Sequence, residues 1–358
     1  MENQQLLVNV LPSPTYNWLR MNDADVQVPA TVTEGNPMVT RTPDVEAGVT
    51  SYTEIQHIAG GMGYDFDRFV KASGVDVLKL QMKKDAKAVQ PVHLEFNYAE
   101  NASELNAVFI DAEENSTVTV VMDFRSQAEI GFAAVQTKLH LAKGARVLLV
   151  QIQRLGEEFR FLNDVAAQTE EDARFEQIEL VLGGAETYQG ARTDLLGARS
   201  SLKTDIGYLL KKEEHLDMNY IANHIGRKTE CAIDVKGVLR DEAHKLFRGT
   251  IDLRKGAKGA VGNELEDVLL MDDHVINQTI PVILCDEEDV EGNHGATIGR
   301  IDDALLFYLE SRGMSRKAVY EMMADARIDA VIHKIPDAET RDRVAMELTG
   351  HKEERYND

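Results

Sequence analysis

The chain has 358 residues, of which 43% are hydrophobic, and its 61 acidic and 39 basic side chains give a formal net charge of −22. This length allows two or three domains with a substantial core, while the negative charge would repel a polyphosphate backbone and excludes nucleic acid as a partner. No apolar run reaches the roughly 20 residues that span a bilayer, and the first residues lack the basic region of a secretory signal, so we expect a cytoplasmic protein that contacts no membrane.

The first part of the chain, residues 1–85, predicts a small N-terminal domain of helical or mixed structure. It contains the only tryptophan, Trp18, and a glycine-punctuated segment at residues 60–63. Residues 65–73 place aromatic and aliphatic side chains at helical spacing, and Gly74 follows them as a stop signal. This pattern predicts a short helix.

The central part, residues 86–298, predicts a core built from β-strands. Apolar and polar side chains alternate there with a period of two, as in Ile178, Leu180 and Leu182, and short strands recur between turns that are acidic or contain glycine. Periodicity alone leaves a sandwich, a barrel and a solenoid open. We find no fixed repeat length, which weighs against a regular solenoid without excluding one with variable turns.

The last part, residues 299–358, returns to helical periodicity. The pattern predicts one helix that stops at Gly313, a second that Ser315 caps, and a third that follows Pro336 and ends at Gly350. The amphipathic faces of these helices fit packing against the chain itself and a docking surface for a partner equally well.

No self-contained enzyme signature occurs in the chain. The glycine-rich run at residues 256–263 lacks the Gly-Lys-Ser/Thr ending of a phosphate loop, so it predicts a turn. Nucleophile elbows, His-Glu-x-x-His motifs and dinucleotide-binding fingerprints are missing from the sequence. The two cysteines, Cys231 and Cys285, are too few for a disulfide framework, and we expect both to be structural. We therefore expect a protein that is not an enzyme.

The histidine in the most informative setting is His294, because Gly292 and Gly295 flank it and leave its ring accessible. An imidazole is a suitable ligand for iron and also carries protons near neutral pH. From the residues alone, a structural role for His294 in capping or in stabilising a turn remains the alternative to a functional role.

The run from Asp289 to Gly313 closely resembles the C-terminal signature of SufD proteins, non-ATPase subunits of the SUF iron–sulfur cluster assembly machinery. The resemblance covers about the last third of the chain in clear motifs and is weaker at residues 17–20. It implies a right-handed parallel β-helix core flanked by N-terminal and C-terminal helical domains. Further segments that carry it are Gly237, Leu246–Ile251 and Leu269–Met271.

Two details of the resemblance favour SufD over its paralogue SufB. SufB-like chains carry a His-Glu pair where this chain has His294-Gly295, and a cysteine where it has Glu266. The resemblance implies that His294 acts as a ligand or proton relay in cluster assembly at the interface with SufB, where it would bind a transient iron–sulfur cluster or iron together with SufB residues. Some SufD proteins carry a cysteine where this chain has Gly292, so a thiol ligand from that position is excluded.

The resemblance also implies partners. The chain would be a scaffold subunit that pairs with a SufB-like paralogue or forms a homodimer. Its C-terminal helices would dock SufC, an ATPase of the ABC type, so that ATP acts only through that partner.

Two other classes of function fit a β-rich chain. One is a β-helical carbohydrate-active enzyme that uses Asp272 with Asp273, or Glu264 with Glu266, as paired carboxylates. The other is a structural β-solenoid without chemistry, in which these residues are solvated acidic turns.

Overall fold

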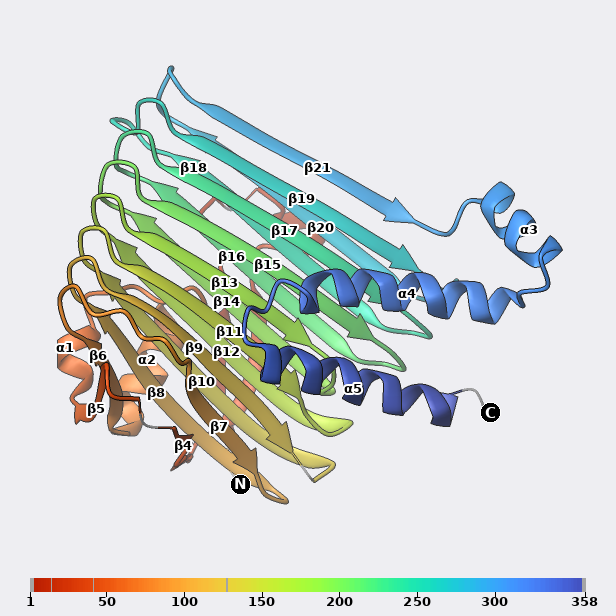
Figure 1. Ribbon diagram of the computed structural model, residues 1–358, viewed down its shortest axis with the longest axis horizontal. Helices are drawn as coiled ribbons and strands as arrows, with labels where there is room; N and C mark the ends of the chain where they lie inside the picture. Colours follow the sequence, from red (N-terminus) through yellow and green to blue (C-terminus); the bar gives the residue numbers. More distant parts are fainter. Residues whose placement is uncertain (1–2, 14, 41, 127, 356–358) are drawn as a thin grey trace.

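The core of the protein is a parallel β-helix, or solenoid, made of two facing sheets (Figure 1). The computed structural model describes residues 3–13, 15–40, 42–126 and 128–355, with side chains for all of these except residues 17 and 349–355. Each coil of the solenoid contributes one strand to each sheet, so that consecutive strands alternate between the sheets. The expected β-helix is confirmed.

The two sheets are named here sheet 1 and sheet 2. Sheet 1 contains, in spatial order, β20 (Ile276–Cys285), β18 (His244–Leu253), β16 (His215–His224), β14 (Glu186–Leu195), β12 (Glu158–Thr169), β10 (Ile130–Leu141), β8 (Ala102–Ala112), β6 (Val77–Met82) and β5 (Val45–Thr50), and β3 (Thr33–Glu34) pairs with β8. Sheet 2 contains β21 (Glu291–Gly299), β19 (Val261–Leu270), β17 (Glu230–Leu239), β15 (Ser201–Leu210), β13 (Arg174–Val181), β11 (Arg146–Arg154), β9 (Thr117–Ser126), β7 (Val92–Tyr98) and β4 (Met38–Val39).

The length of a coil varies, which explains why the sequence shows no fixed repeat. Arg160 pairs with Glu186 across a shorter coil than the one that joins His244 to its partner Ile276. One corner of each coil nevertheless keeps the same geometry. At this corner a residue with positive φ donates its backbone N–H to a backbone carbonyl oxygen at the same corner of the next coil. Members of this corner ladder are Asp85, Asn115, Gly144, Asp172, Arg199, Lys228 and Gly259.

The interior of the solenoid is filled by the alternate side chains of both sheets. The inward residues of β18, for example, include Phe247, Ile251 and Leu253, which belong to one continuous apolar cluster with residues of almost every coil. Because successive side chains of a strand point to opposite faces, the phase of this cluster identifies which residues of the last coil face inward.

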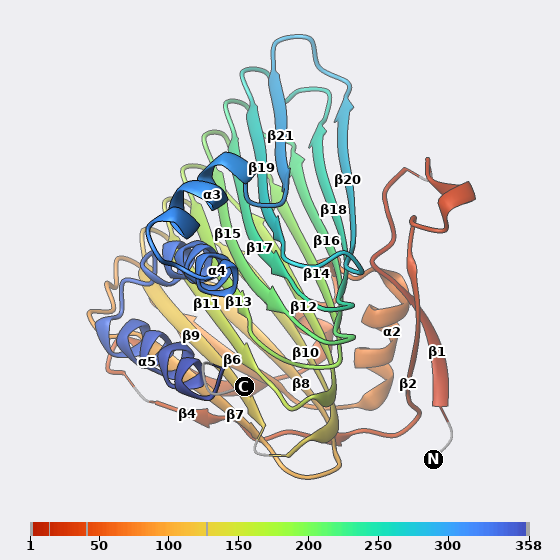
Figure 2. The ribbon, with the colours of Figure 1, turned by 90° about the vertical axis from the view of Figure 1, so that its right-hand side faces the viewer.

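The N-terminal region packs on the outer face of sheet 1 (Figure 2). It contains an antiparallel pair, β1 (Asn3–Val8) with β2 (Ala24–Pro29), a 3-10 helix η1 (Asn17–Leu19), and the helices α1 (Tyr52–Ile55) and α2 (Tyr64–Ser73). As predicted, α2 ends at Gly74, whose φ is 71°.

The segment that precedes α2 touches the sheet backbone. A Cβ on Gly61 would lie 2.4 Å from the backbone nitrogen of Ala191, so only glycine fits there.

A strap formed by residues 9–13 and 15–23 reaches β16 and β18 through buried polar contacts. The guanidinium of Arg248, which is fully buried, donates to the backbone oxygens of Met21 at 2.6 Å and Asp23 at 3.1 Å, and to Asp217 at 2.6 Å. Asn9 donates to the same carboxylate of Asp217 at 2.6 Å. The strap therefore ties the start of the chain to coils that are far away in the sequence.

The C-terminal helices lie on the outer face of sheet 2, on the side opposite to the N-terminal region (Figure 2). They are α3 (Asp303–Ser311), α4 (Arg316–Ile332) and α5 (Ala338–Arg355). Ser315 caps α4 as predicted, and its side chain accepts from the N–H of Ala318. The predicted end of the third helix at Gly350 is wrong, because α5 continues to Arg355.

Ion pairs hold α4 and the residues after it on the sheet. Arg327 lies 3.2 Å from Asp267, and Lys334 lies 3.0 Å from Asp234. None of the helices in the described ranges is long and apolar enough to cross a membrane.

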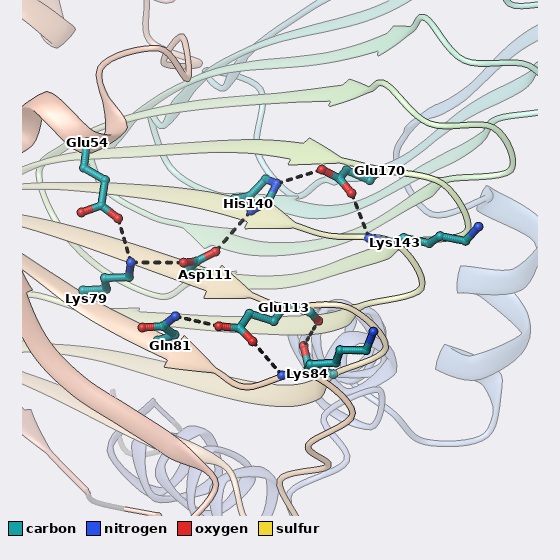
Figure 3. A network of polar contacts seen from close by, with 10 residues as sticks. Glu54, Lys79, Gln81, Lys84, Asp111, Glu113, His140, Lys143 and Glu170 are labelled. Atoms are coloured by element: carbon teal, nitrogen blue, oxygen red, sulfur yellow. Dashed lines mark hydrogen bonds and ion pairs between the residues drawn. The ribbon is translucent and has the colours of Figure 1, made fainter.

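A ladder of alternating charges crosses the outer face of sheet 1 near its first coils (Figure 3). It runs from Glu54 through Lys79 and Asp111 to His140 and Glu170, with contacts of 2.7, 3.1, 3.2 and 3.3 Å. Hydrogen bonds to the carboxylates of Asp111 and then Glu170 raise the pKa of His140.

Candidate functional site

The last coil leaves one end of the solenoid uncovered. β20 and β21 are the terminal strands of the two sheets, and within the described chain each has a strand neighbour on one side only. Their inward side chains would be buried if another coil followed, but Ile283 is 36% and Ile298 is 40% exposed. We call this end the mouth; its inward residues are Asn277, Thr279, Pro281, Ile283 and Cys285 of β20, and Gly292, His294, Ala296 and Ile298 of β21.

His294 lies in the middle of β21 and faces inward over the mouth. A Cβ on Gly292 would meet Ile283 at 3.1 Å and Leu253 at 3.3 Å, both of which are inward residues, so position 292 points into the solenoid. His294 is two residues further along the strand and shares this face. Its side chain is exposed because no later coil covers it.

Glu264 of β19 is the direct register partner of His294. Its carboxylate lies over Gly249 of β18, where a Cβ would be 2.1 Å from Oε2. Glu264 is only 3% exposed, and no hydrogen bond from a described residue to its carboxylate is found. Burial, together with the negative charge of Glu266, raises the pKa of Glu264 to about 7, while Lys245 opposes this shift.

A buried ion pair lies beside Glu264. Lys245 of β18 contacts the carboxylate of Glu266, and its ammonium also donates to Thr279 Oγ1 at 2.9 Å and to the backbone oxygen of Gln278 at 3.2 Å. Thr279 in turn donates to Glu266 at 2.8 Å. We call these oxygen atoms around Lys245 Nζ the lysine pocket. Burial lowers the pKa of Lys245, and Glu266 opposes that shift.

This arrangement offers proton transfer and cation binding at one place. Glu264, whose pKa is raised to about 7, is the register neighbour of His294, which is exposed, and a carboxyl group with such a pKa can accept or release a proton near neutral pH. In the part of the chain that the structure describes, no three His, Cys, Asp or Glu side chains are already arranged to hold a metal ion.

The structure brings together residues that sequence reasoning treated separately. His294 and Glu266 were singled out, and Glu264 was considered only as one of a pair of hydrolytic carboxylates. Lys245 was missed, although it falls on the inward phase of the alternation that Phe247 continues.

The other candidate residues lie in ordinary structural settings. Cys231 is buried, which raises the pKa of its thiol to about 12. Cys285 is exposed at the mouth, and its thiol donates to the backbone oxygen of Glu287 at 3.2 Å. The carboxylates of Asp272 and Asp273 belong to the turn after β19, where Asp272 accepts from the N–H of Asp241 at 2.7 Å.

Comparison with known proteins identifies the core. Residues 96–327 match the family model described as the SufBD core domain of the SUF system for FeS cluster assembly. The chain is 25% identical over 261 residues to the iron–sulfur cluster assembly protein SufD of Bacillus subtilis, a match that covers 72% of this chain and 60% of that protein. It is 24% identical over 276 residues to an iron–sulfur cluster assembly SufBD family protein of Mycobacterium bovis, with 75% and 69% covered.

A third relative is an iron–sulfur cluster assembly SufBD family protein of Staphylococcus epidermidis, 24% identical over 262 residues. That match covers 72% of this chain and 56% of the relative. The chain therefore spans less than two thirds of the length of the B. subtilis and S. epidermidis proteins.

Proposed function

The chain belongs to the SufBD core family of the SUF iron–sulfur cluster assembly system, and we propose that it is a SufD-like scaffold subunit that builds a cluster at its mouth together with a second solenoid. A SufB-like chain is the partner that we propose, and a second copy of this chain is the alternative partner. The cluster, or the iron that precedes it, is the cargo of this site.

The observation that carries the proposal is the uncovered end of the solenoid. Two strand edges, one from each sheet, end there side by side, and apolar side chains such as Ile283 and Ile298 are exposed between them. Unpaired strand edges and exposed apolar side chains favour the addition of further strands. A partner that covers both edges at once must itself present two sheets, as the end of another solenoid does.

His294 is the residue that we expect to act on the cargo. Its imidazole is exposed at the centre of β21, so a partner that covers the mouth brings its own side chains to this ring. Imidazole nitrogen suits iron as a ligand. In its second role, His294 exchanges protons with the carboxyl group of Glu264 below it.

The C-terminal helices offer a surface for the ATPase partner. α3 extends away from the solenoid (Figure 1) and exposes Phe307 at 73%, Tyr308 at 51% and Leu305 at 40%. Exposed large apolar side chains that cluster on one short helix are typical of a protein interface. We propose that a SufC-like ATPase docks there and transmits the energy of ATP hydrolysis to the paired solenoids.

The test is anaerobic co-expression with a SufB-like chain and a SufC-like ATPase, followed by size-exclusion chromatography and analysis of iron and sulfide in the complex. We expect a three-component complex that accumulates both elements. Replacing His294 with Ala should leave the complex intact and lower its iron and sulfide content. The matched control is His57→Ala, which removes an exposed histidine far from the mouth.

Two results would contradict the proposal. A chain that elutes without either partner would refute the scaffold role. A His294→Ala complex that accumulates as much cluster as the His57→Ala complex would refute the role of His294 alone.

A further inference from the structure

A half-open cavity lies among β4, β5, β6 and β8, at the end of the solenoid opposite to the mouth (Figure 1). We call it the first-coil pocket. It has a volume of about 130 Å³, and its lining includes Glu34, Val39, Val49, Asp76, Leu78 and Asn106. The pocket forms where one side of β8 changes its partner strand. Glu34 of β3 pairs with Leu105, and Val77 of β6 pairs with Ala107, so that Asn106 has no register partner on that side in the described chain.

The side chain of Asn106 forms the floor of the first-coil pocket. Val108 and Ile110 of the same strand belong to the interior apolar cluster, so Asn106 faces the interior as well. It is 4% exposed, and its Nδ2 has no hydrogen-bond partner among the described residues. A buried amide N–H without a partner costs free energy. A bound molecule that supplies an acceptor oxygen would remove this cost.

The rim of the pocket is acidic. Glu34 and Asp76 are exposed there, and the carboxylate of Glu34 accepts from the backbone N–H of Asp76 at 3.2 Å. A third carboxylate lies beside the floor, because a Cβ on Gly35 would be 2.4 Å from Asn106 Nδ2 and 2.8 Å from Glu104 Oε2. The described residues that line the pocket include no Lys, Arg or His. The pocket therefore favours a cation.

The walls of the pocket indicate an organic cation. Val39, Leu78 and Val108 line it, and apolar walls stabilise a hydrocarbon body, whereas a metal ion needs several oxygen or nitrogen ligands. A cavity of about 150 Å³ holds benzene, so the first-coil pocket has room for about six non-hydrogen atoms. The Cα atom, side chain and carbonyl group of a valine residue have this size.

We propose that the first-coil pocket binds an α-ammonium carbonyl group with a short aliphatic side chain. The ammonium faces the carboxylates of Glu34 and Asp76, the aliphatic side chain lies against the apolar walls, and the carbonyl oxygen accepts from Asn106 Nδ2. An amino-acid amide and the amino terminus of a polypeptide share this chemistry. A free amino acid does not fit, because its own carboxylate would meet that of Glu104. This binding site does not depend on the function proposed above.

The test uses the full chain without partners and follows the methyl signals of each probe by saturation-transfer NMR. Valinamide represents the free amine, and the tripeptide Val-Ala-Ala amide represents a polypeptide terminus. N-acetylvalinamide lacks the ammonium charge, and valine adds a carboxylate. We expect saturable binding of valinamide, of the tripeptide or of both, and binding of N-acetylvalinamide and of valine that is weaker by about tenfold or more. A tripeptide that binds at least as tightly as valinamide identifies a polypeptide terminus as the ligand, and weaker binding identifies a free amine.

Variants locate the site. Asn106→Leu removes the donor at the floor and should weaken the binding of valinamide or the tripeptide about threefold to tenfold; its control is Asn97→Leu at an exposed position of β7. The double variant Glu34→Gln with Asp76→Asn removes both rim charges and should weaken binding by about tenfold. Its control is Glu46→Gln, which neutralises an exposed carboxylate outside the pocket. Both controls should leave the affinity unchanged.

The proposal is overturned if neither valinamide nor the tripeptide binds, if N-acetylvalinamide binds as tightly as valinamide, or if the Asn106 and rim variants behave like their controls. Far-UV circular dichroism and a cooperative melt confirm that each variant is folded; if Asn106→Leu is unfolded, the rim variant and N-acetylvalinamide decide the question. Failure of the co-expression experiment would leave these titrations unaffected. The two proposals can therefore fail separately.

Discussion

Replacement of Arg248 by Met tests how strongly the N-terminal strap is bound. The variant loses a buried ion pair with Asp217, a buried hydrogen bond to the strap backbone at Met21 and a part-buried one at Asp23. Removing one partner of a buried ion pair costs about 3 to 5 kcal/mol, mostly because the other charge stays buried. Asn9 still donates to Asp217, so we expect the lower end of that range.

The measurement is urea-induced unfolding followed by far-UV circular dichroism. Circular dichroism is preferable to fluorescence because the only tryptophan, Trp18, is fully exposed and reports little on the core. The double variant with Asp217→Asn should be more stable than the sum of the two single effects predicts, since it leaves no unpaired charge. The control is Arg146→Met at an exposed position of β11, which should change stability by about 0.5 kcal/mol or less.

A loss below about 1 kcal/mol in Arg248→Met, or strict additivity in the double variant, would refute the reasoning. Either result would mean that the strap and the coils are not coupled through this arginine.

Two further predictions concern the charge ladder and the mouth. The pKa of His140 is raised above its unfolded value by hydrogen bonds to Asp111 and Glu170. The stabilisation that protonated His140 provides is therefore complete below an unfolded pKa of about 6.5 and is lost as the pH rises through the folded pKa. The melting temperature of the wild type should exceed that of His140→Gln by less at about pH 8 than at about pH 6. The comparison variant is His57→Gln, and a difference that stays constant with pH would contradict the prediction. Gly249→Ala should lower the melting temperature by more than Gly48→Ala does, because the new methyl group would lie 2.1 Å from the carboxylate of Glu264 and force that side chain to move inside the packed interior. Gly48→Ala is the control because a Cβ there meets no atom within 4 Å, and equal melting temperatures of the two variants would rule out this position for the carboxylate.

The β-rich core and its strands could be predicted from alternation, but their architecture could not. Alternation looks the same in a sandwich and in a solenoid, and the unequal lengths of the coils hide the repeat. The information was present at the corners, where Asn115, Gly144 and Asp172 adopt positive φ at nearly even spacing along the chain. Asn, Gly and Asp are the residues that tolerate this conformation best.

The candidate site was predicted only in part. His294 was found through its glycine neighbours. Its pairing with Glu264 could not be predicted, because it depends on the length of the chain between β19 and β21, and a register shift of one position would pair His294 with Leu265 instead. The strap could not be predicted, because its contacts join Asn9 to Asp217 and Met21 to Arg248, pairs that lie almost two thirds of the chain apart.

The two ends of the solenoid differ, and this difference limits the assemblies that the chain can build. At the first coil, β5 and β4 run antiparallel to their neighbours, β4 is very short, and β5 is mostly exposed and contains Glu46 and Gly48. Short, charged and irregular edges of this kind resist further pairing. A solenoid with two open ends would stack head to tail into a filament, whereas one with a single open end can only join mouth to mouth. In the pairing proposed above, such a contact would close after two solenoids, and growth along the solenoid axis would stop at a pair.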